Sequence, residues 1–307
     1  MKTRSISFLI AAFLVPGGVS AELVISEIHY HPASELVTEE FIELHNTGPS
    51  AVDLSGWAFT SGVTFSFPPA TLLAADGRLV VAADSAAFTA KYPAVTNFVA
   101  GWTGRLSNSS NTITLKDAAG NKIDEVDYSD DGDWGQRRKD WWSDHGHKGL
   151  SWDVGTDGGI SAPPYSNAPA DILPKDRSLE LINDAFDNST GQNWGPSLTA
   201  GGSPGTANSI AAGNIAPVIR EVAHFPVVPK SSDPVYVTAE VTDDHASPLA
   251  VTANWRVDGG STFTAVTMAD DGSHGDVLPG DGIYGAILPL QPGGTIVEFH
   301  VSASDGS

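Results

Sequence analysis

Carboxylates and imidazoles alternate along two stretches near the start of the chain. Glu27, His29 and His31 occupy every second position, as do Glu43 and His45. Alternate side chains of a β-strand point to the same side, so all five would share one sheet face if the stretches pair, and such a set could bind zinc. A polar outer face with cross-strand carboxylate–imidazole contacts explains the same alternation. We expect this structural role and assign no metal ligands here.

Two acidic loops approach the spacing of an EF-hand calcium site. A loop starting at Asp127 would place Arg138 at position 12, where the EF-hand requires a bidentate glutamate. A loop starting at Asp270 would place Gly272 and His274 at ligand positions 3 and 5. Neither loop is therefore an EF-hand.

The second acidic loop leaves a looser calcium site open. Asp271, Asp276 and Asp281 could form a cage of carboxylate oxygens. The alternative is a hairpin loop that needs glycine and aspartate for its backbone angles. The sequence does not decide between the two.

A Gly-x-Ser-x-Gly pattern at residues 201–205 matches the nucleophile elbow of serine hydrolases. The elbow uses the amide of the residue after serine in its oxyanion hole, and that residue here is Pro204, which has no N–H. We expect a tight turn instead. The sequence also lacks a phosphate-binding loop, a kinase motif set and a dinucleotide fingerprint. We therefore predict no catalytic residues and no cofactor.

Tryptophans and basic residues alternate in a Gly-rich segment at residues 130–174. Such a pattern could stack nucleobases, but residues 130–157 hold four Lys and Arg against seven Asp, a net charge of -3 that argues against nucleic acid. Exposed tryptophans could instead bind sugar rings or a protein partner. We expect them to pack inward. The aromatic and basic residues are Trp134, Arg137, Arg138, Lys139, Trp141, Trp142, His145, His147, Lys148 and Trp152.

The elements that carry these residues are predicted to be β-strands. Short alternating or β-branched stretches recur between Gly, Pro, Asn and Asp turns, which is typical of all-β sandwiches. One helix is predicted at residues 84–92, capped by Asp84 or Ser85 and ended by Pro93. The predicted strands are residues 23–31, 40–45, 63–67, 78–83, 112–116, 122–128, 178–182, 218–225, 235–241, 251–257, 263–268, 283–288 and 295–304.

These elements divide into a leader and two domains. Residues 1–21 form a signal peptide, with a basic start, a short apolar run and small residues before the cleavage point. Residues 22–209 form one β-sandwich with an insertion at 130–174, and a linker at 210–215 precedes an immunoglobulin- or fibronectin-like sandwich at 216–307. That domain has six of the usual seven strands, so we expect it to be truncated and further domains to follow. No stretch is long enough for a membrane-spanning helix.

The composition sets further limits. The formal net charge of -21 over 307 residues argues against a polyphosphate partner. The absence of cysteine excludes disulfides, thiolate metal sites and cysteine nucleophiles. An exported chain without cysteine favours a bacterial source.

The first domain resembles the lamin-tail family, an immunoglobulin-like fold found in nuclear lamins and in many exported bacterial proteins. The residues that carry the resemblance are 24–28, 40–48, 52–57, 67–69 and 79–81, and it extends through 111–128 and, more loosely, 178–208. In physical terms, Gly56 would form a tight turn that sends Trp57 into the core. The two prolines after Phe67 would end a strand.

Together these features predict an exported, non-enzymatic protein that mediates adhesion or positioning at the cell surface. Its partner would be a protein or a polysaccharide of unknown identity. The alternative, implied by the resemblance, is an accessory module of a larger secreted enzyme. Its catalytic domain, a spore-coat-protein-type (CotH-type) kinase or a hydrolase, would lie beyond residue 307.

Overall fold

The structure is a computed structural model that describes residues 23–129, 134, 176–245 and 248–306. The predicted signal peptide and nearly all of the predicted insertion at 130–174 lie outside these residues. The described chain is almost entirely β and forms immunoglobulin-like β-sandwiches, so the predicted fold class is confirmed. No helix in this part of the chain has the length and apolar character needed to cross a membrane.

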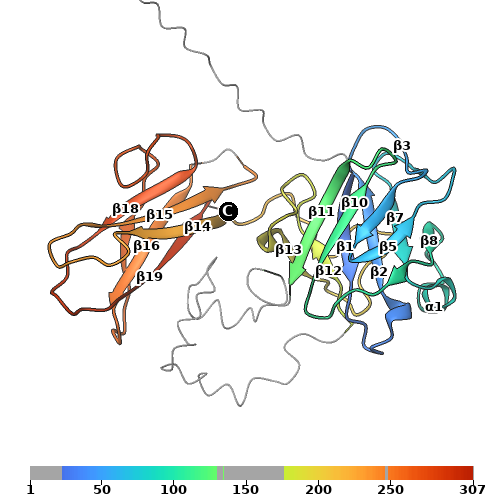
Figure 1. Cartoon of the computed structure of the whole chain (residues 1–307), viewed down its shortest axis with the longest axis horizontal. Coiled ribbons are helices and arrows are strands. Elements are labelled where there is room, and N and C mark those ends of the chain that lie inside the picture. The colour runs from blue at the N-terminus through green and yellow to red at the C-terminus, as the bar shows by residue number, and fades with distance from the viewer. Residues whose placement is uncertain (1–22, 130–133, 135–175, 246–247, 307) are drawn as a thin grey trace, which may run out of the picture.

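The first group of strands forms two packed sheets (Figure 1). Among the described residues, the larger sheet has six strands in the order β13 (Trp194–Pro196), β12 (Leu179–Leu181), β1 (Leu23–His29), β2 (Phe41–Asn46), β7 (Arg78–Ala82) and β8 (Phe98–Ala100). Only the pairing of β7 with β8 is parallel within this sheet.

The facing sheet contains, in the described chain, β11 (Lys122–Ser129), β10 (Ser110–Lys116), β4 (Ala58–Ser61), β5 (Val63–Ser66) and β9 (Thr103–Gly104) in that order. A small pair, β3 (Val52–Asp53) with β6 (Leu72–Leu73), lies beside it. Short 3₁₀ turns occur at Val37–Glu39 and Gly191–Asn193.

The core of this sandwich lies between the two sheets. Alternate residues of β10 and β11 point inward, so Ile113, Val126 and Tyr128 are fully buried. Gly56 has the positive φ expected for its turn, but it is Leu54 that enters the core, and Trp57 is only partly buried. Trp57 therefore packs against the core but is less buried than predicted.

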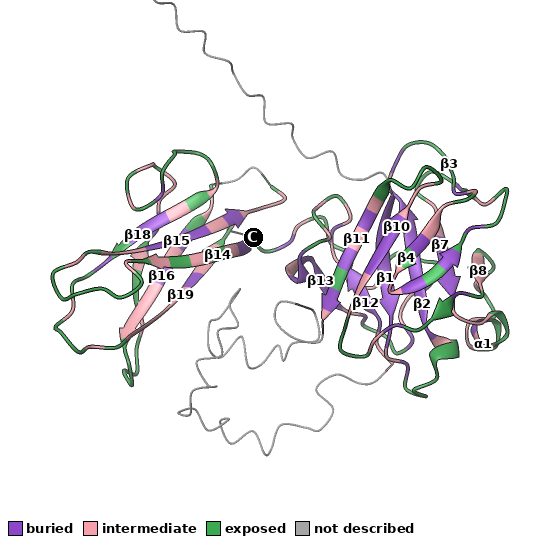
Figure 2. Cartoon of the chain, viewed as in Figure 1, coloured by how far each residue is buried: buried purple, intermediate pink, exposed green. Residues whose placement is uncertain are grey.

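The outer face of the six-stranded sheet is also covered. The helix α1 (Ser85–Lys91) lies on one half, where Phe88 packs with Phe41 and Phe98 in a second apolar cluster. Asp84 caps the helix by accepting a hydrogen bond from the Ala87 amide at 2.8 Å, as predicted. Figure 2 shows the result, a sheet whose central strands are buried on both faces.

The second group of strands forms a separate sandwich with its own core. Within the described residues, one sheet is β14 (Val218–Phe225), β15 (Val235–Thr242) and β18 (Ile283–Leu288), and the other is β17 (Thr264–Thr267), β16 (Ala250–Val257) and β19 (Val297–Ser304). Val237, Val251 and Val301 are buried between them. The predicted division of the chain, with boundaries at 209 and 216, stays a prediction.

Polar contacts join the two groups. The Gln192 side chain donates to the Ile219 carbonyl at 2.9 Å and accepts from its amide at 3.2 Å. Arg220 and Asp187 form an ion pair at 2.7 Å. The two groups are therefore linked by hydrogen bonds and an ion pair.

Candidate functional site

Three glutamates lie side by side in the six-stranded sheet. Glu27 of β1 is the register partner of Glu43 on β2 and of Glu180 on β12. A register shift between Ile25 and Glu27 sets this pairing. All three side chains belong to fully buried residues, although ionisable groups are seldom buried without partners.

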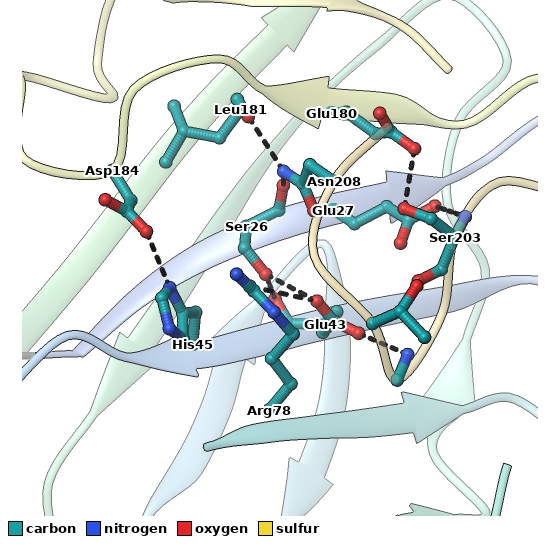
Figure 3. A network of polar contacts seen from close by, with 12 residues as sticks. Ser26, Glu27, Glu43, His45, Arg78, Glu180, Leu181, Asp184, Ser203 and Asn208 are labelled. Atoms are coloured by element: carbon teal, nitrogen blue, oxygen red, sulfur yellow. Dashed lines mark hydrogen bonds and ion pairs between the residues drawn. The ribbon is translucent and has the colours of Figure 1, made fainter. Parts of the chain in front are cut away.

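The segment 197–210, which follows β13, covers the three carboxylates (Figure 3). Its backbone is irregular, so its amides need acceptors outside a sheet ladder. The Ser203 amide donates to Glu27 Oε1 at 2.8 Å, the Gly205 amide to Glu43 Oε2 at 2.6 Å, and the Ile210 amide to Glu180 Oε2 at 3.1 Å. Each glutamate therefore holds one point of the covering segment. We call Glu27, Glu43 and Glu180 with this segment the carboxylate clamp.

Serine hydroxyls donate further hydrogen bonds to the clamp carboxylates, whereas the buried Glu27 Oε2 accepts none within the described chain. Ser178 donates to Glu27 Oε1 at 2.5 Å and Ser26 to Glu43 Oε1 at 2.9 Å. Ser203 and Ser209 each donate to Glu180 at 2.7 Å. These hydroxyls supply hydrogen bonds that a buried carboxylate needs.

Asn208 and Gly202 fix the path of the covering segment. The Asn208 amide group donates to the carbonyls of Ser26 and Leu181, both at 2.8 Å, and so ties the segment to β1 and β12. Gly202 has φ +76°, and a Cβ there would overlap Glu27 Oε1 and the Ser178 hydroxyl. A side chain at position 202 would therefore displace a clamp carboxylate.

The clamp has little positive charge to balance it. Arg78 Nη1 lies 3.5 Å from Glu43 Oε1. Burial, reinforced by the neighbouring charge of Glu43, raises the pKa of Glu27 well above its ordinary value. Burial likewise raises the pKa of Glu43. Glu27 and Glu43 thus tend to keep a proton that they would lose in the unfolded chain.

A fourth buried glutamate lies at the start of β2. Glu40 is 2% exposed and accepts a hydrogen bond from the Leu106 amide at 2.8 Å. Burial raises its pKa to about 7. Like the clamp glutamates, it binds a backbone amide of an irregular segment.

The three histidines of the alternating pattern do not converge. His29 Nε2 lies 3.4 Å from Asp176 Oδ1, and its ring packs on Phe41. His31 pairs with Glu35 at 3.2 Å. The set that could have bound zinc does not assemble, because each imidazole faces a different carboxylate.

His45 lies furthest from the other two histidines along the paired strands. It contacts Asp76 at 3.0 Å and Asp184 at 2.8 Å. Carboxylate–imidazole contacts, the role expected from the sequence, are therefore present. However, the expected partners were on the neighbouring strand, and the observed ones come from loops. The face was also expected to be open, and it is buried.

Ser203 lies in a turn, as predicted. Gly201, Gly202 and Gly205 have positive φ, and the Ser203 hydroxyl donates to Glu180. No strand-to-helix elbow surrounds it among the described residues. This geometry therefore does not support a nucleophile elbow at Ser203.

The acidic loop of the second sandwich brings a different set together from the one predicted. Asp270, Asp276 and Asp281 place carboxylate oxygens within 4.8 Å of one another. Asp271 lies outside this group and pairs with His274 at 3.0 Å. Asp270 thus takes the place in the group that the sequence hypothesis gave to Asp271. A further described group, Asp243, Asp244 and His245, lies at the start of a different loop.

A groove of about 260 Å³ lies at one end of the second sandwich. It runs between the loop after β14 and the loop after β18, and its lining includes Leu290, Val297 and Phe299. Val227 and Val228, in the first of these loops, are 76% and 84% exposed. Sequence reasoning did not single out this surface.

Of the tryptophan-rich segment, only Trp134 lies within the described residues. It is 8% exposed and packs beside Trp194, with the ring centroids 6.0 Å apart. Trp134 therefore packs inward, as expected. The other residues predicted there, from Arg137 to Trp152, lie outside the described residues.

Comparison with known families gives a match that covers Glu27 and Glu43 but neither Glu180 nor the covering segment. No curated protein is similar to the chain. Residues 18–130 match the model of the Lamin Tail Domain family.

Proposed function

We propose that this chain is an exported, non-catalytic interaction protein that tethers or positions its partner at the cell surface. A lamin-tail-like sandwich and an immunoglobulin-like sandwich would supply the contact surfaces. The partner would be a surface protein or polysaccharide. The fold alone does not imply a function, so the proposal depends on what the polar and apolar groups do.

The main support is the use of the polar groups. Each clamp glutamate accepts hydrogen bonds from a covering backbone, and all three residues are fully buried. A general acid or base must reach a substrate proton at hydrogen-bond distance. Groups enclosed in this way serve the scaffold, so we assign no catalytic residue.

The second support is the apolar groove between the loops after β14 and β18. Val227 and Val228 are exposed beside it, and Leu290 within it is 59% exposed. Exposed apolar side chains that gather with a groove are typical of binding surfaces. We therefore place the contact surface at this end of the second sandwich.

Binding of the purified chain to cell-envelope preparations tests this proposal. Val228→Glu introduces a charge beside the groove, and we expect it to weaken binding about tenfold, or about 1.4 kcal/mol. Leu72→Glu is the matched control, because Leu72 is 65% exposed on the first sandwich and far from the groove in the chain. No binding by the wild type, or turnover of phosphoesters or glycosides that Glu43→Gln abolishes, would overturn the proposal.

The alternative function is an accessory module of a larger secreted enzyme, with a CotH-type kinase or hydrolase domain in the same protein. Its support is the resemblance to bacterial proteins in which a lamin-tail domain precedes such an enzyme. The full coding sequence tests it directly. A catalytic domain encoded downstream would favour the accessory role over independent adhesion.

A further inference from the structure

The loop between β17 and β18 is fixed at both ends. Ala269 forms an antiparallel bridge with Gly285 of β18, with hydrogen bonds of 2.9 and 2.8 Å between their backbones. Gly275, midway along the loop, has φ +98° and lies against the Tyr236 side chain of β15. The loop is therefore folded back onto the sheet rather than extended into solvent.

Three carboxylates from this loop converge. Asp270, Asp276 and Asp281 each offer an oxygen, and these oxygens lie within 4.8 Å of one another. No Lys, Arg or His within the described chain forms an ion pair with any of the three. Like charges this close repel one another unless a cation or protons compensate them.

Asp276 gives an independent indication of a missing ligand. The residue is 4% exposed, and its Oδ2 accepts a hydrogen bond from the Gly272 amide at 2.6 Å. Its other oxygen, Oδ1, is buried and has no hydrogen-bond donor among the described residues. A buried carboxylate oxygen without a partner is costly, and native proteins rarely leave one so. A cation would supply the partner.

The other two carboxylates are held in place by backbone amides. Asp270 Oδ1 accepts from the Gly280 amide at 2.6 Å, and Oδ2 from the Gly282 amide at 3.0 Å. Asp281 Oδ1 accepts from the Ile283 amide at 3.0 Å. Asp270 Oδ1 also accepts from the Asp281 amide at 3.3 Å. These bonds orient the side chains before any ligand binds, and Asp270 Oδ2 and Asp281 Oδ1 each keep a second lone pair.

We propose that Asp270, Asp276 and Asp281 bind a calcium ion. The donors are all oxygens, which suits a hard divalent cation, and an irregular loop suits the flexible coordination of calcium better than the strict octahedron of magnesium. Water or backbone carbonyls would complete the roughly six to eight ligands that calcium takes. Bound calcium would join both ends of the loop and stabilise the second sandwich.

Calcium binding by the full chain tests the proposal. Equilibrium dialysis with radioactive calcium should show a site with a dissociation constant of roughly 10⁻⁴–10⁻³ M, the range of extracellular modules. Asp281→Asn removes an exposed ligand and is expected to leave the fold intact, and Asp276→Asn removes the buried one. Both should weaken binding about tenfold or more. Asp271→Asn is the control, because it removes the same charge one residue away from the site and should bind as the wild type does.

Thermal unfolding gives a second measurement. With calcium at about 10 mM, the unfolding temperature of the second sandwich should rise by roughly 5 °C or more relative to a chelator, in the wild type and in Asp271→Asn only. Identical melting with calcium and chelator would overturn the proposal. So would calcium binding that Asp281→Asn leaves unchanged, because the ion would then bind elsewhere, for example at Asp243 and Asp244.

Discussion

Replacing Gly202 with alanine tests the carboxylate clamp at its tightest point. The new Cβ would overlap Glu27 Oε1 and the Ser178 hydroxyl, and would lie 3.0 Å from Ser178 Cβ. The sheet and the covering segment enclose these groups, so the carboxylate has to move. Its movement would break the hydrogen bonds from the Ser178 hydroxyl and the Ser203 amide.

Two contributions set the size of the effect. The first is backbone strain: an alanine at positive φ lowers the free energy of unfolding by about 1–2 kcal/mol. This strain applies equally to Gly202, with φ +76°, and to the control position Gly120, with φ +89°. Gly120 lies in an exposed turn where the Cβ of an alanine would meet no atom within 4 Å, so only this strain applies there. At Gly202, buried groups left without partners add about 2–4 kcal/mol. We therefore expect Gly202→Ala to cost about 3–6 kcal/mol and Gly120→Ala about 1–2 kcal/mol.

Urea unfolding followed by tryptophan fluorescence measures both variants. The free energy of unfolding falls by about 1–3 kcal/mol per M urea, so Gly202→Ala should lower the urea midpoint of the first sandwich by roughly 1 M or more. The midpoint of the second sandwich should stay unchanged. Equal losses in the two variants would refute the reasoning, because the overlap with Glu27 would then carry no cost.

Three further predictions concern the first sandwich. Glu40 has a pKa of about 7 in the folded chain and near 4.5 in the unfolded chain, so the free energy of unfolding should fall by about 1–2 kcal/mol as pH rises between these values. Urea midpoints at pH 5 and 7.5 measure this fall, and Glu40→Gln should make the midpoint depend less on pH. Asp124→Ala should lower the free energy of unfolding by about 1–3 kcal/mol, because the buried Ile25 amide loses its acceptor at 2.6 Å. The control Asp127→Ala, on the exposed side of β11, should lower it by less than about 0.5 kcal/mol. Equal urea midpoints in the two variants would contradict this. Phe88→Ala should cost about 3–5 kcal/mol and speed hydrogen exchange in α1, since the ring is 1% exposed beneath the helix.

The longer elements could be predicted from the sequence because local patterns specify them. The alternation of β10, β11 and β14–β19, and the Asp84 cap of α1, depend on residues close together in the chain. Short strands such as β3, β6 and β9, each of two residues, were not predicted. Pairing with distant strands defines them, and two residues carry no periodic pattern.

The site was only partly predictable for a similar reason. The alternating glutamates and histidines were visible, but the Gly- and Ser-rich segment that covers the glutamates was predicted only as a tight turn at residues 201–205. Its role depends on contacts between Glu27 and Ser203, 176 positions apart. A sequence signal does exist in retrospect, since Ser203 and Ser209 supply donors that a buried carboxylate requires, and Asn208 ties the segment to the carbonyls of Ser26 and Leu181.

The central claim is that the buried glutamates hold a backbone segment rather than act on a substrate. Hydrogen exchange of the Ser203 and Gly205 amides measures this most directly, because these groups donate to Glu27 and Glu43. We predict exchange as slow as in the central strands β1 and β2, with the Gly205 amide becoming fast in Glu43→Ala. Exchange at the rate of an open loop in the wild-type chain would contradict the account.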